Sequence, residues 1–335
     1  MTTQAVVGYN TITDVVNQYT SLDAHAAYIE AAKTLTRKCP LAAILPMVPS
    51  NQIMSNIGSR DSYLPTPGTR RFNQGVTPTA SHTKPFTEPI CMVEDYSEVD
   101  YALWKIQNDP NRWRAGKDQR KVEALTQKME DLLLYGSLTS DPGGINGFMT
   151  RLNSLTNRPN DDATWPYNVL GAGGSGGDTG SILVVQFGIG KVYGIYPKNS
   201  PGGLQIEDLG KSTKESSTGT LMEVMRTHFS WYMGLTVEDE RCMQRIVNIE
   251  VSGSTNIFSH SQLIEAINNL PDGGADPSTT IFVPRAIKTQ LDIQAVDKNN
   301  VQYMPSEVWG RTVTAFRGVP VMLAEMLDTT ETAVA

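Results

Sequence analysis

The chain has 335 residues, enough for one large domain or two ordinary ones with a substantial buried core. It carries 28 Lys and Arg against 35 Asp and Glu, a formal net charge of −7. This acidic balance argues against a protein that holds nucleic acid by neutralising phosphates, and the charge is not gathered into a tail. The three cysteines Cys39, Cys91 and Cys242 lie far apart, which disfavours a disulfide framework or zinc cluster and favours reduced thiols.

The N-terminal region shows neither a targeting signal nor a membrane anchor. The opening MTTQAVVGYN has no cationic region and no apolar stretch, so no secretory signal peptide is expected. No apolar run approaches the roughly 18 residues of a membrane span. Residues 22–37 are predicted to form a helix, with Ser21 or Asp23 as its cap and Pro40 as its end.

Residues 58–90 combine many prolines and glycines with Thr and Ser, which excludes a helix and leaves few side chains to bury. A structureless loop of this length is uncommon inside a compact domain. The composition therefore predicts a two-stranded arm, whose legs of about 15 residues reach about 50 Å at about 3.3 Å per residue. A compact chain of this length has a radius of gyration of only about 20 Å, so the arm is expected to lie on a neighbouring subunit.

The predicted arm is opposite in charge to the rest of the chain. Its net charge is +2, which leaves about −9 elsewhere and suits a contact between subunits. Arg70 and Arg71 are the expected anchors, because a guanidinium binds a carboxylate through two hydrogen bonds. Their partner is either the acidic stretch 94–100 or the long helix of the next subunit, and the alternative is a loop that touches only its own chain.

Residues 97–136 are predicted to be helical, with a start at Pro110 and a second start capped by Asp118. Gly136 stands where a helix-ending glycine belongs. Apolar side chains at helical spacing predict one buried stripe: Leu125, Met129 and Leu132.

The middle of the chain changes from loop to strand. Residues 137–180 are predicted to be loop, with a glycine-rich segment at 171–180. Strands are predicted at 181–187 and 191–196. The clearest alternation of apolar and polar residues covers 229–237 and predicts one core face and one solvated face.

The last third alternates between helices and strands and is expected to form an α/β lobe over 247–325. Ser259 and Gln262 have the spacing of a capping box at a helix start. Pro284 is expected to begin a second helix after a strand at 279–283. Two further strands are predicted around a turn made by Gly318, Val319 and Pro320.

Two motifs that carry chemistry in other proteins lie in the glycine-rich segment. Residues 171–176 match G-x-G-x-x-G, and Ser175 lies in a G-x-S-x-G pattern, with His228 and His260 as candidate bases. Both motifs require a helix directly after them, whereas a strand is predicted here. A Ser hydrolase or a nucleotide-binding α/β enzyme therefore stays a minor alternative, and the runs 161–162 and 238–240 are interpreted as solvated turns.

Several short segments, in chain order, resemble the major capsid proteins of tailed bacteriophages with the Hong Kong 97-type fold, and most closely the podovirus-like group. They are Arg70-Arg71-Phe72-Asn73-Gln74-Gly75-Val76, Tyr135-Gly136 with Asp141-Pro142, Val192-Tyr193-Gly194-Ile195-Tyr196-Pro197, Arg245-Ile246-Val247-Asn248-Ile249 and Gly318-Val319-Pro320-Val321. The resemblance covers about 40–325.

The resemblance implies an α+β chain with the five parts of that fold. They are an N-arm (1–55), an extended E-loop (56–92), a P-domain (93–250) with a spine helix at about 110–136 and the glycine-rich loop, an A-domain (251–312), and a return to the P-domain (313–335). It further assigns intersubunit contacts to Arg70, Arg71, Asn73 and Lys84, the helix core to Leu125, Met129 and Leu132, and a turn to Gly318 and Pro320.

The function implied is that of a coat protein which self-assembles, as pentamers and hexamers, into an icosahedral head. The shell encloses double-stranded DNA without sequence-specific binding, and no cofactor, metal, catalytic site or membrane is expected. Scaffolding, portal and possible decoration proteins are the implied partners, and assembly in the host bacterial cytoplasm is implied for the virion capsid. A compartment shell of the same fold, an encapsulin, is the main alternative.

Overall fold

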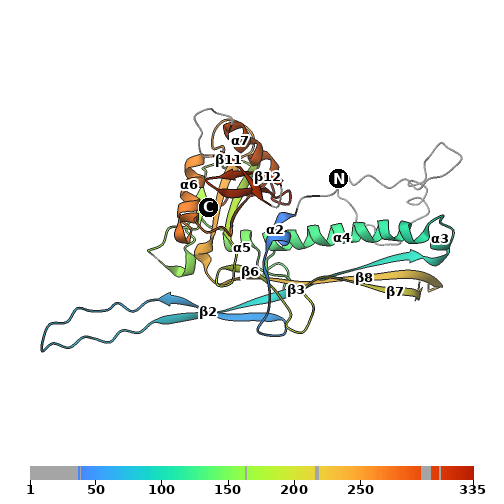
Figure 1. The fold of residues 1–335 in the computed structure, drawn as a ribbon, viewed down its shortest axis with the longest axis horizontal. Coiled ribbons are helices and arrows are strands. Elements are labelled where there is room, and N and C mark those ends of the chain that lie inside the picture. The colour runs from blue at the N-terminus through green and yellow to red at the C-terminus, as the bar shows by residue number, and fades with distance from the viewer. Residues whose placement is uncertain (1–36, 38, 163, 216–218, 296–302, 309–310) are drawn as a thin grey trace. The chain divides into compact units, whose positions relative to one another are not determined.

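The computed structural model describes residues 37, 39–162, 164–215, 219–295, 303–308 and 311–335 (Figure 1). The helix predicted over 22–37 lies outside these residues, apart from its last position. The described residues form two compact units. The smaller unit contains Met92–Lys128 and Gly203–Tyr232, and the larger contains Arg37–Cys91, Met129–Gly202 and Met233–Ala335.

A seven-stranded sheet forms the lobe of the larger unit, in the order β11-β12-β13-β10-β5-β9-β4. Neighbouring strands are antiparallel, except that β13 is parallel to β10 and β4 is parallel to β9. The strands are β11 (Tyr303–Val308), β12 (Arg311–Phe316), β13 (Val319–Leu323), β10 (Thr279–Val283), β5 (Thr179–Gln186), β9 (Met243–Glu250) and β4 (Val169–Gly171).

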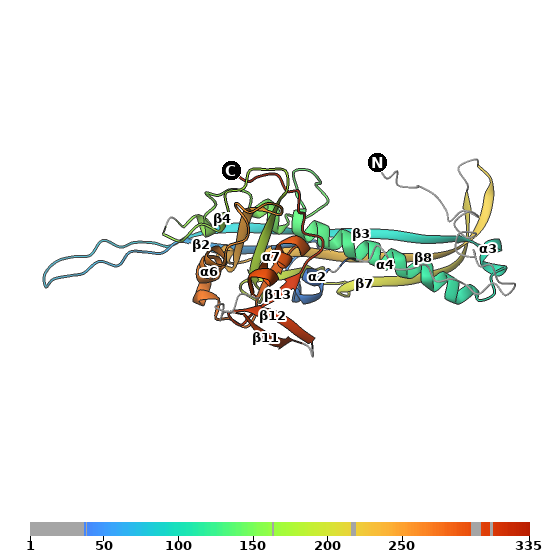
Figure 2. The ribbon, with the colours of Figure 1, turned by 90° about the horizontal axis from the view of Figure 1, so that it is seen from above.

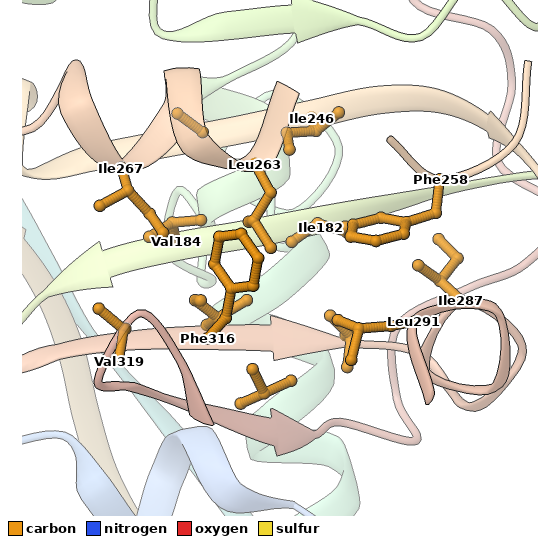
Figure 3. Close-up of a cluster of buried hydrophobic side chains, with 14 of the residues drawn as sticks. Ile182, Val184, Ile246, Phe258, Leu263, Ile267, Ile287, Leu291, Phe316 and Val319 are labelled. Carbon is orange, nitrogen blue, oxygen red and sulfur yellow. The ribbon is translucent and has the colours of Figure 1, made fainter. Parts of the chain in front are cut away.

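Helices α6 (His260–Asn268) and α7 (Arg285–Ala295) pack against this sheet (Figure 2). Figure 3 shows the apolar cluster that joins them, in which Leu263 from α6 and Leu291 from α7 meet Phe316 from β12. All three side chains are fully buried. Strand β5 is buried along its whole length, so its central residues 182–185 are all apolar and do not alternate with polar ones.

A second sheet has the strand order β1-β6-β8-β3-β2. In the larger unit, β1 runs parallel to β6, and β2 pairs with the first half of β3 as an antiparallel hairpin. This hairpin confirms the two-stranded arm predicted over 58–90. The strands are β1 (Met47–Pro49), β6 (Val192–Tyr196), β8 (Leu221–Val237), β3 (His82–Asp100) and β2 (Ser55–Tyr63).

The smaller unit is built on β7 (Gly203–Glu215), which pairs antiparallel with the first part of β8. Helices α3 (Tyr101–Lys105) and α4 (Pro110–Tyr135) follow β3, so the helix predicted at about 110–136 is confirmed. Arg114 fastens α4 to the two strands, because its guanidinium contacts Asp208 at 2.5 Å and the Thr227 hydroxyl at 2.8 Å.

In the larger unit, the last turns of α4 hold the short helix α2 (Pro40–Ile44) through Glu130. The Glu130 carboxylate is fully buried and accepts the backbone N–H groups of Leu41 at 3.1 Å and Ala42 at 2.8 Å. These are N–H groups that the first turn of a helix leaves unpaired, so Glu130 caps α2 from a distant part of the chain.

The remaining elements are short: α5 (Phe148–Arg151) and the single-turn helices η1 (Pro159–Asp161), η2 (Glu240–Cys242) and η3 (Pro271–Gly274). Segment 137–180 is therefore not all loop. The glycine-rich part, 171–180, connects β4 to β5: its first residue ends β4 and its last two residues begin β5. In the described part of the chain, no helix has the length and apolar character that crossing a membrane requires.

Two predictions about the long helical segment were wrong. Residues 97–100 belong to β3, where Ser97 and Val99 point to the buried side and Asp100 then caps α3 by accepting the N–H of Ala102 at 2.7 Å. The helix also does not restart at Asp118. Helix α4 continues through this position, and the Asp118 carboxylate accepts the Thr227 hydroxyl at 3.1 Å instead.

One cap was also assigned wrongly, and one short helix was not predicted. That helix is α2, which begins at Pro40, where proline fits because it lacks the N–H that the first helical position leaves unused. The helix that Pro40 was expected to end lies outside the described residues, apart from its last position. Ser259 is the N-cap of α6, yet its side chain makes no capping hydrogen bond. Gln262 instead donates to the Gly171 carbonyl oxygen at 3.0 Å, so the predicted capping box does not form.

The strand predicted over 229–237 is the second half of β8, but its polar face is not solvated. Ser230 and Thr236 are buried, and His228 stacks on Tyr96 with 4.6 Å between ring centroids. Its apolar face is not uniformly core either, because Trp231 is only partly buried. The alternation was real, but buried side chains lie on both faces of the strand.

The turn near the C-terminus is displaced by one residue from its predicted place. Strands β12 and β13 pair Phe316 with Val319, which leaves Arg317 and Gly318 as the two turn residues. Both have positive φ, 52° and 85°, as a two-residue hairpin of type I′ requires. Pro320 is therefore a strand residue of β13 and not part of the turn.

Candidate intersubunit surfaces

The tip of the β2/β3 hairpin is exposed over a long continuous stretch. Every residue from 64 to 85 is exposed, and the Phe72 side chain reaches 97%. In Figure 1 the hairpin extends away from the seven-stranded sheet of the larger unit and its helices. Leu64 and Val76 add apolar surface at 72% and 46% exposure. Such a surface is typical of a segment that another molecule covers.

The tip has a defined backbone turn. The Gln74 N–H donates to the Arg71 carbonyl oxygen at 3.2 Å, and Asn73 adopts a φ of 62°, a conformation that Asn tolerates better than most residues. The turn presents Arg70, Arg71, Phe72 and Asn73 together. Within the described part of the chain, neither Arg70 nor Arg71 makes an ion pair. Lys84 lies lower, opposite Arg60 on the paired legs.

The root of the hairpin is held in place by Arg60. Its guanidinium donates to the Val237 carbonyl oxygen and to Glu240 at 2.6 Å, and it lies 4.4 Å from the centroid of the Phe86 ring. Its side chain is only 16% exposed. The sequence-based interpretation counted Arg60 among the charges available for a subunit contact, but the structure uses it to anchor the hairpin.

Glu88 completes this anchor from β3. The side chain is 6% exposed and accepts two hydrogen bonds from Arg151 of α5, while Arg60 lies 3.6 Å away on its other side. A buried carboxylate paired with two guanidinium groups holds the root of the hairpin in place within the larger unit. The sequence analysis gave no separate role to Glu88, Arg151 or Phe72. The available signals were a carboxylate just before the apolar residues 90–93 and an aromatic residue directly after two arginines.

A groove of about 540 Å³ lies beside the root of the hairpin. Asp239 lies in the wall of the groove and pairs with Arg241, whose guanidinium donates to both carboxylate oxygens. Burial alone would raise the pKa of Asp239, but the hydrogen bonds from Arg241 outweigh it and hold the pKa below its usual value. Four carboxylates face two guanidinium groups in the lining: Asp61, Asp162, Glu238 and Asp239 against Arg60 and Arg241.

The acidic stretch 94–100 is not a free acceptor for the tip. In the smaller unit, Glu98 lies within ion-pair distance of Lys214 and of Arg226, the latter at 2.7 Å. Asp95 pairs with Lys121 at 2.8 Å, and Asp100 caps α3. These carboxylates already have partners in their own unit, so the stretch offers little unpaired negative charge to a neighbouring subunit.

The other residues singled out from the sequence lie in the interior or at a turn. Leu125, Met129 and Leu132 are buried on α4, with exposures between 0% and 8%. Gly318 forms the β12/β13 turn, as described above. The assignment of these residues to a particular role in assembly stays a prediction.

The motifs with possible enzymatic chemistry do not assemble into a site. Ser175 is exposed in the connection from β4 to β5, and a nucleophile elbow would need a helix after the serine. His260 packs instead against Phe258, at 5.2 Å between ring centroids. Glu238 and Glu240 are hydrogen-bonded to Tyr193 and Asn160 and are not a solvated turn. Within the described ranges, no group of three or more His, Cys, Asp or Glu could hold a metal ion.

Comparison with solved structures defines the class of fold. A chain of bacteriophage Epsilon15 matches with a TM-score of 0.73 and 23% identity, over 99% of this chain and 100% of that one. The capsid of bacteriophage JBD30 matches with a TM-score of 0.50 and 12% identity, over 95% and 99%. The fold is the Hong Kong 97-type fold of tailed-phage capsid proteins.

The family model described as major capsid protein GP7 matches residues 23–335, and the chain belongs to this family. It is a phage coat protein, which assembles in many copies into the icosahedral shell of the virion. No curated protein matches the chain. An encapsulin complex from Synechococcus elongatus PCC 7942 matches with a TM-score of 0.47 and 11% identity, over 75% of this chain and 99% of that one. This likeness is too low to favour a compartment shell.

Proposed function

We propose that the β2/β3 hairpin is the arm that joins one coat subunit to the next, and that the chain acts purely as a structural subunit. The observation that carries this proposal is the contrast between the two ends of the hairpin. Its root is fixed by the buried pair of Glu88 and Arg151, whereas residues 64–85 are exposed throughout. A rigid root with an exposed aromatic and basic tip suits a contact with another molecule.

The tip residues have distinct roles in this proposal. Phe72 supplies apolar area that leaves water on contact, Arg70 and Arg71 supply directed hydrogen bonds to carboxylates, and Asn73 sets the turn. Lys84 contributes positive charge from the leg of the hairpin. Buried Leu125, Met129 and Leu132 keep α4 rigid as the spine of the subunit, and the turn at Gly318, followed by Pro320 in β13, returns the chain to the body.

Shortening the hairpin tests the arm directly. Tyr63 and His82 face each other in the register of β2 and β3, so Asn-Gly can replace residues 64–81 and close a two-residue turn. We expect a soluble, folded monomer that no longer forms particles, measured by sedimentation and electron microscopy. A chain in which residues 64–81 are replaced by a Gly/Ser linker of equal length is the matched control for loop length. Normal particles from the Asn-Gly chain would contradict the arm.

The remaining aspects of the function rest on the family and on charge. The shell encloses double-stranded DNA without sequence-specific binding, and a net charge of −7 does not suit a shell that condenses its genome by neutralising phosphates. Pentamers and hexamers of this chain, with scaffolding, portal and possible decoration proteins, complete the head in the host bacterial cytoplasm. The ranges given above for the N-arm, E-loop, P-domain and A-domain belong to the same proposal. Mass spectrometry of purified particles identifies the partner proteins and any copurified cargo enzyme.

A further inference from the structure

The groove at the root of the hairpin has the charge and shape to receive the tip of another hairpin. We propose that Arg70, Arg71 and Phe72 of one subunit dock into the groove beside Asp61 and Asp162 of a second copy of this chain. The inference rests on the proposed function of the hairpin as an intersubunit arm, and it names the surface on which that arm ends.

The groove presents unsatisfied negative charge. Asp61 is exposed, and it makes no ion pair or side-chain hydrogen bond within the described residues. Hydrogen bonds from Thr164 hold the pKa of the Asp162 carboxyl below its usual value, so this side chain is charged at neutral pH. The basic groups of the groove are already committed, because Arg60 binds Glu240 and Arg241 binds Asp239. Of the four lining carboxylates, Asp239 pairs with Arg241 and Glu238 accepts the Tyr193 hydroxyl, which leaves Asp61 and Asp162 for the two arginines of the tip.

The groove also offers an exposed apolar side chain that the aromatic residue of the tip can contact. Leu64 lines the groove and is 72% exposed, and Phe72 is 97% exposed at the end of the hairpin. The groove volume of about 540 Å³ exceeds what one aromatic side chain fills, so the ring leaves space in the groove for a charged neighbour. Aromatic and arginine side chains are enriched among the interface residues that dominate binding energy, and Phe72 directly follows the two arginines.

A hairpin tip cannot enter the groove at its own root. The two legs run side by side, with Gly68 close to Val76 and the Thr79 hydroxyl bonded to the Thr66 carbonyl oxygen at 3.4 Å. Phe72 lies eight positions after Leu64, which places the tip about 26 Å from the root at about 3.3 Å per residue. The occupant of the groove must therefore come from another copy.

Tip and groove are different surfaces of one chain, so the contact is head-to-tail. Such a heterologous contact leaves each subunit with one groove to fill and one tip to place, and it generates rings when the rotation between subunits closes. This is the kind of contact that rings of coat subunits require. A self-complementary contact would stop at a dimer.

Charge reversal on each side and on both sides tests the pairing. The variants are Arg70→Glu with Arg71→Glu, Asp61→Arg with Asp162→Arg, and the combination of all four. Glu207→Arg with Glu265→Arg is the matched control, because both residues are exposed and lie outside the groove. Thermal unfolding of each unassembled chain shows that it is folded, and particle yield is measured by sedimentation.

We expect each one-sided reversal to lower the particle yield at least about tenfold, which corresponds to about 1.4 kcal/mol. The fourfold variant should recover most of that yield, and the control should assemble like the unmodified chain. The loss in the one-sided variants should be smaller near 1 M salt, where the screening length is about 3 Å.

Two outcomes would overturn the groove while leaving the arm intact. One is a groove-reversed chain that assembles like the control. The other is a fourfold variant that folds but regains no particles. Normal assembly of the Asn-Gly chain described above would remove the arm itself. As a direct readout, a mixture of Arg71→Cys chains and Asp162→Cys chains should form disulfide-linked dimers, which neither chain forms alone.

Discussion

Arg151 and Glu88 form an ion pair with two parallel hydrogen bonds, of 2.8 and 2.6 Å, at the root of the β2/β3 hairpin. Arg151 ends the short helix α5, and its Nε also donates to the Asn146 carbonyl oxygen at 3.0 Å. The pair therefore ties a strand that leaves the larger unit to a helix inside it. Because both side chains are largely buried, the hairpin root is one of the places where a single substitution should matter most.

Glu88→Gln should lower the free energy of unfolding by about 3 kcal/mol, because it leaves the Arg151 guanidinium buried beside a neutral group. The measurement is urea unfolding of the unassembled chain. Glu223→Gln is the matched control, because its pair with Lys211 is about half exposed and should contribute less than about 1 kcal/mol. Equal effects of the two substitutions would show that burial of the pair is unimportant.

Leu132→Ala should lower the free energy of unfolding by about 2–5 kcal/mol, because the side chain is 8% exposed and its removal leaves a cavity. Replacing an exposed residue of α4 by alanine, Gln119→Ala, should change the free energy of unfolding by less than about 0.5 kcal/mol. Urea unfolding compares the two. A Leu132→Ala chain as stable as the unmodified one would contradict the buried stripe.

Gly318→Val should reduce the yield of soluble protein and lower the melting temperature. A built Cβ at Gly318 meets no other atom within 4 Å, so the penalty comes from the backbone, whose φ of 85° costs a β-branched residue about 1–2 kcal/mol or more. Gly318→Asn is the control, since Asn adopts positive φ more readily. If Val and Asn had the same effect, backbone strain would not be the cause.

The stability of the unassembled chain should fall as pH rises from about 4.5 to about 7. Burial raises the pKa of Glu130 to about 7, while the N–H groups of Ala42 and Leu41 oppose this rise. Between the unfolded and folded pKa values, the folded chain keeps a proton that the unfolded chain has lost, so raising the pH favours unfolding. The full shift corresponds to roughly 3 kcal/mol.

Glu130→Gln removes this titration and keeps an oxygen that can accept one of the two N–H groups. Its free energy of unfolding should vary less across the same pH window than that of the unmodified chain. Thermal melts at several pH values measure the difference. Parallel pH profiles for the two chains would show that Glu130 does not titrate in this range.

Ser175→Ala should leave particle yield unchanged, because the serine is exposed in a connection between two strands. Sedimentation of the assembled variant checks this expectation. A measurable hydrolase activity in the unmodified chain that the substitution abolished would instead establish the enzymatic alternative.

The sequence by itself determined the elements whose signals are local. Helical spacing of Leu125, Met129 and Leu132 predicted α4, and short apolar runs predicted β5 and β10, because these patterns depend only on residues close together in the chain. The density of proline and glycine in 58–90 excluded a helix and predicted the hairpin. The resemblance of ordered short segments to capsid proteins predicted the fold and the family.

Tertiary structure decided which charges are available, because pairing depends on neighbours that are distant in the chain. Arg60 and Arg70 look alike in the sequence, yet Arg60 bonds to Val237 and Glu240, whereas Arg70 stays exposed at the hairpin tip. Likewise, only the folded chain brings Asp61 and Asp162 to one groove. A carboxylate or guanidinium gains its role from the partner it meets, and hydrogen bonds between residues far apart in the chain leave no periodic pattern in the sequence.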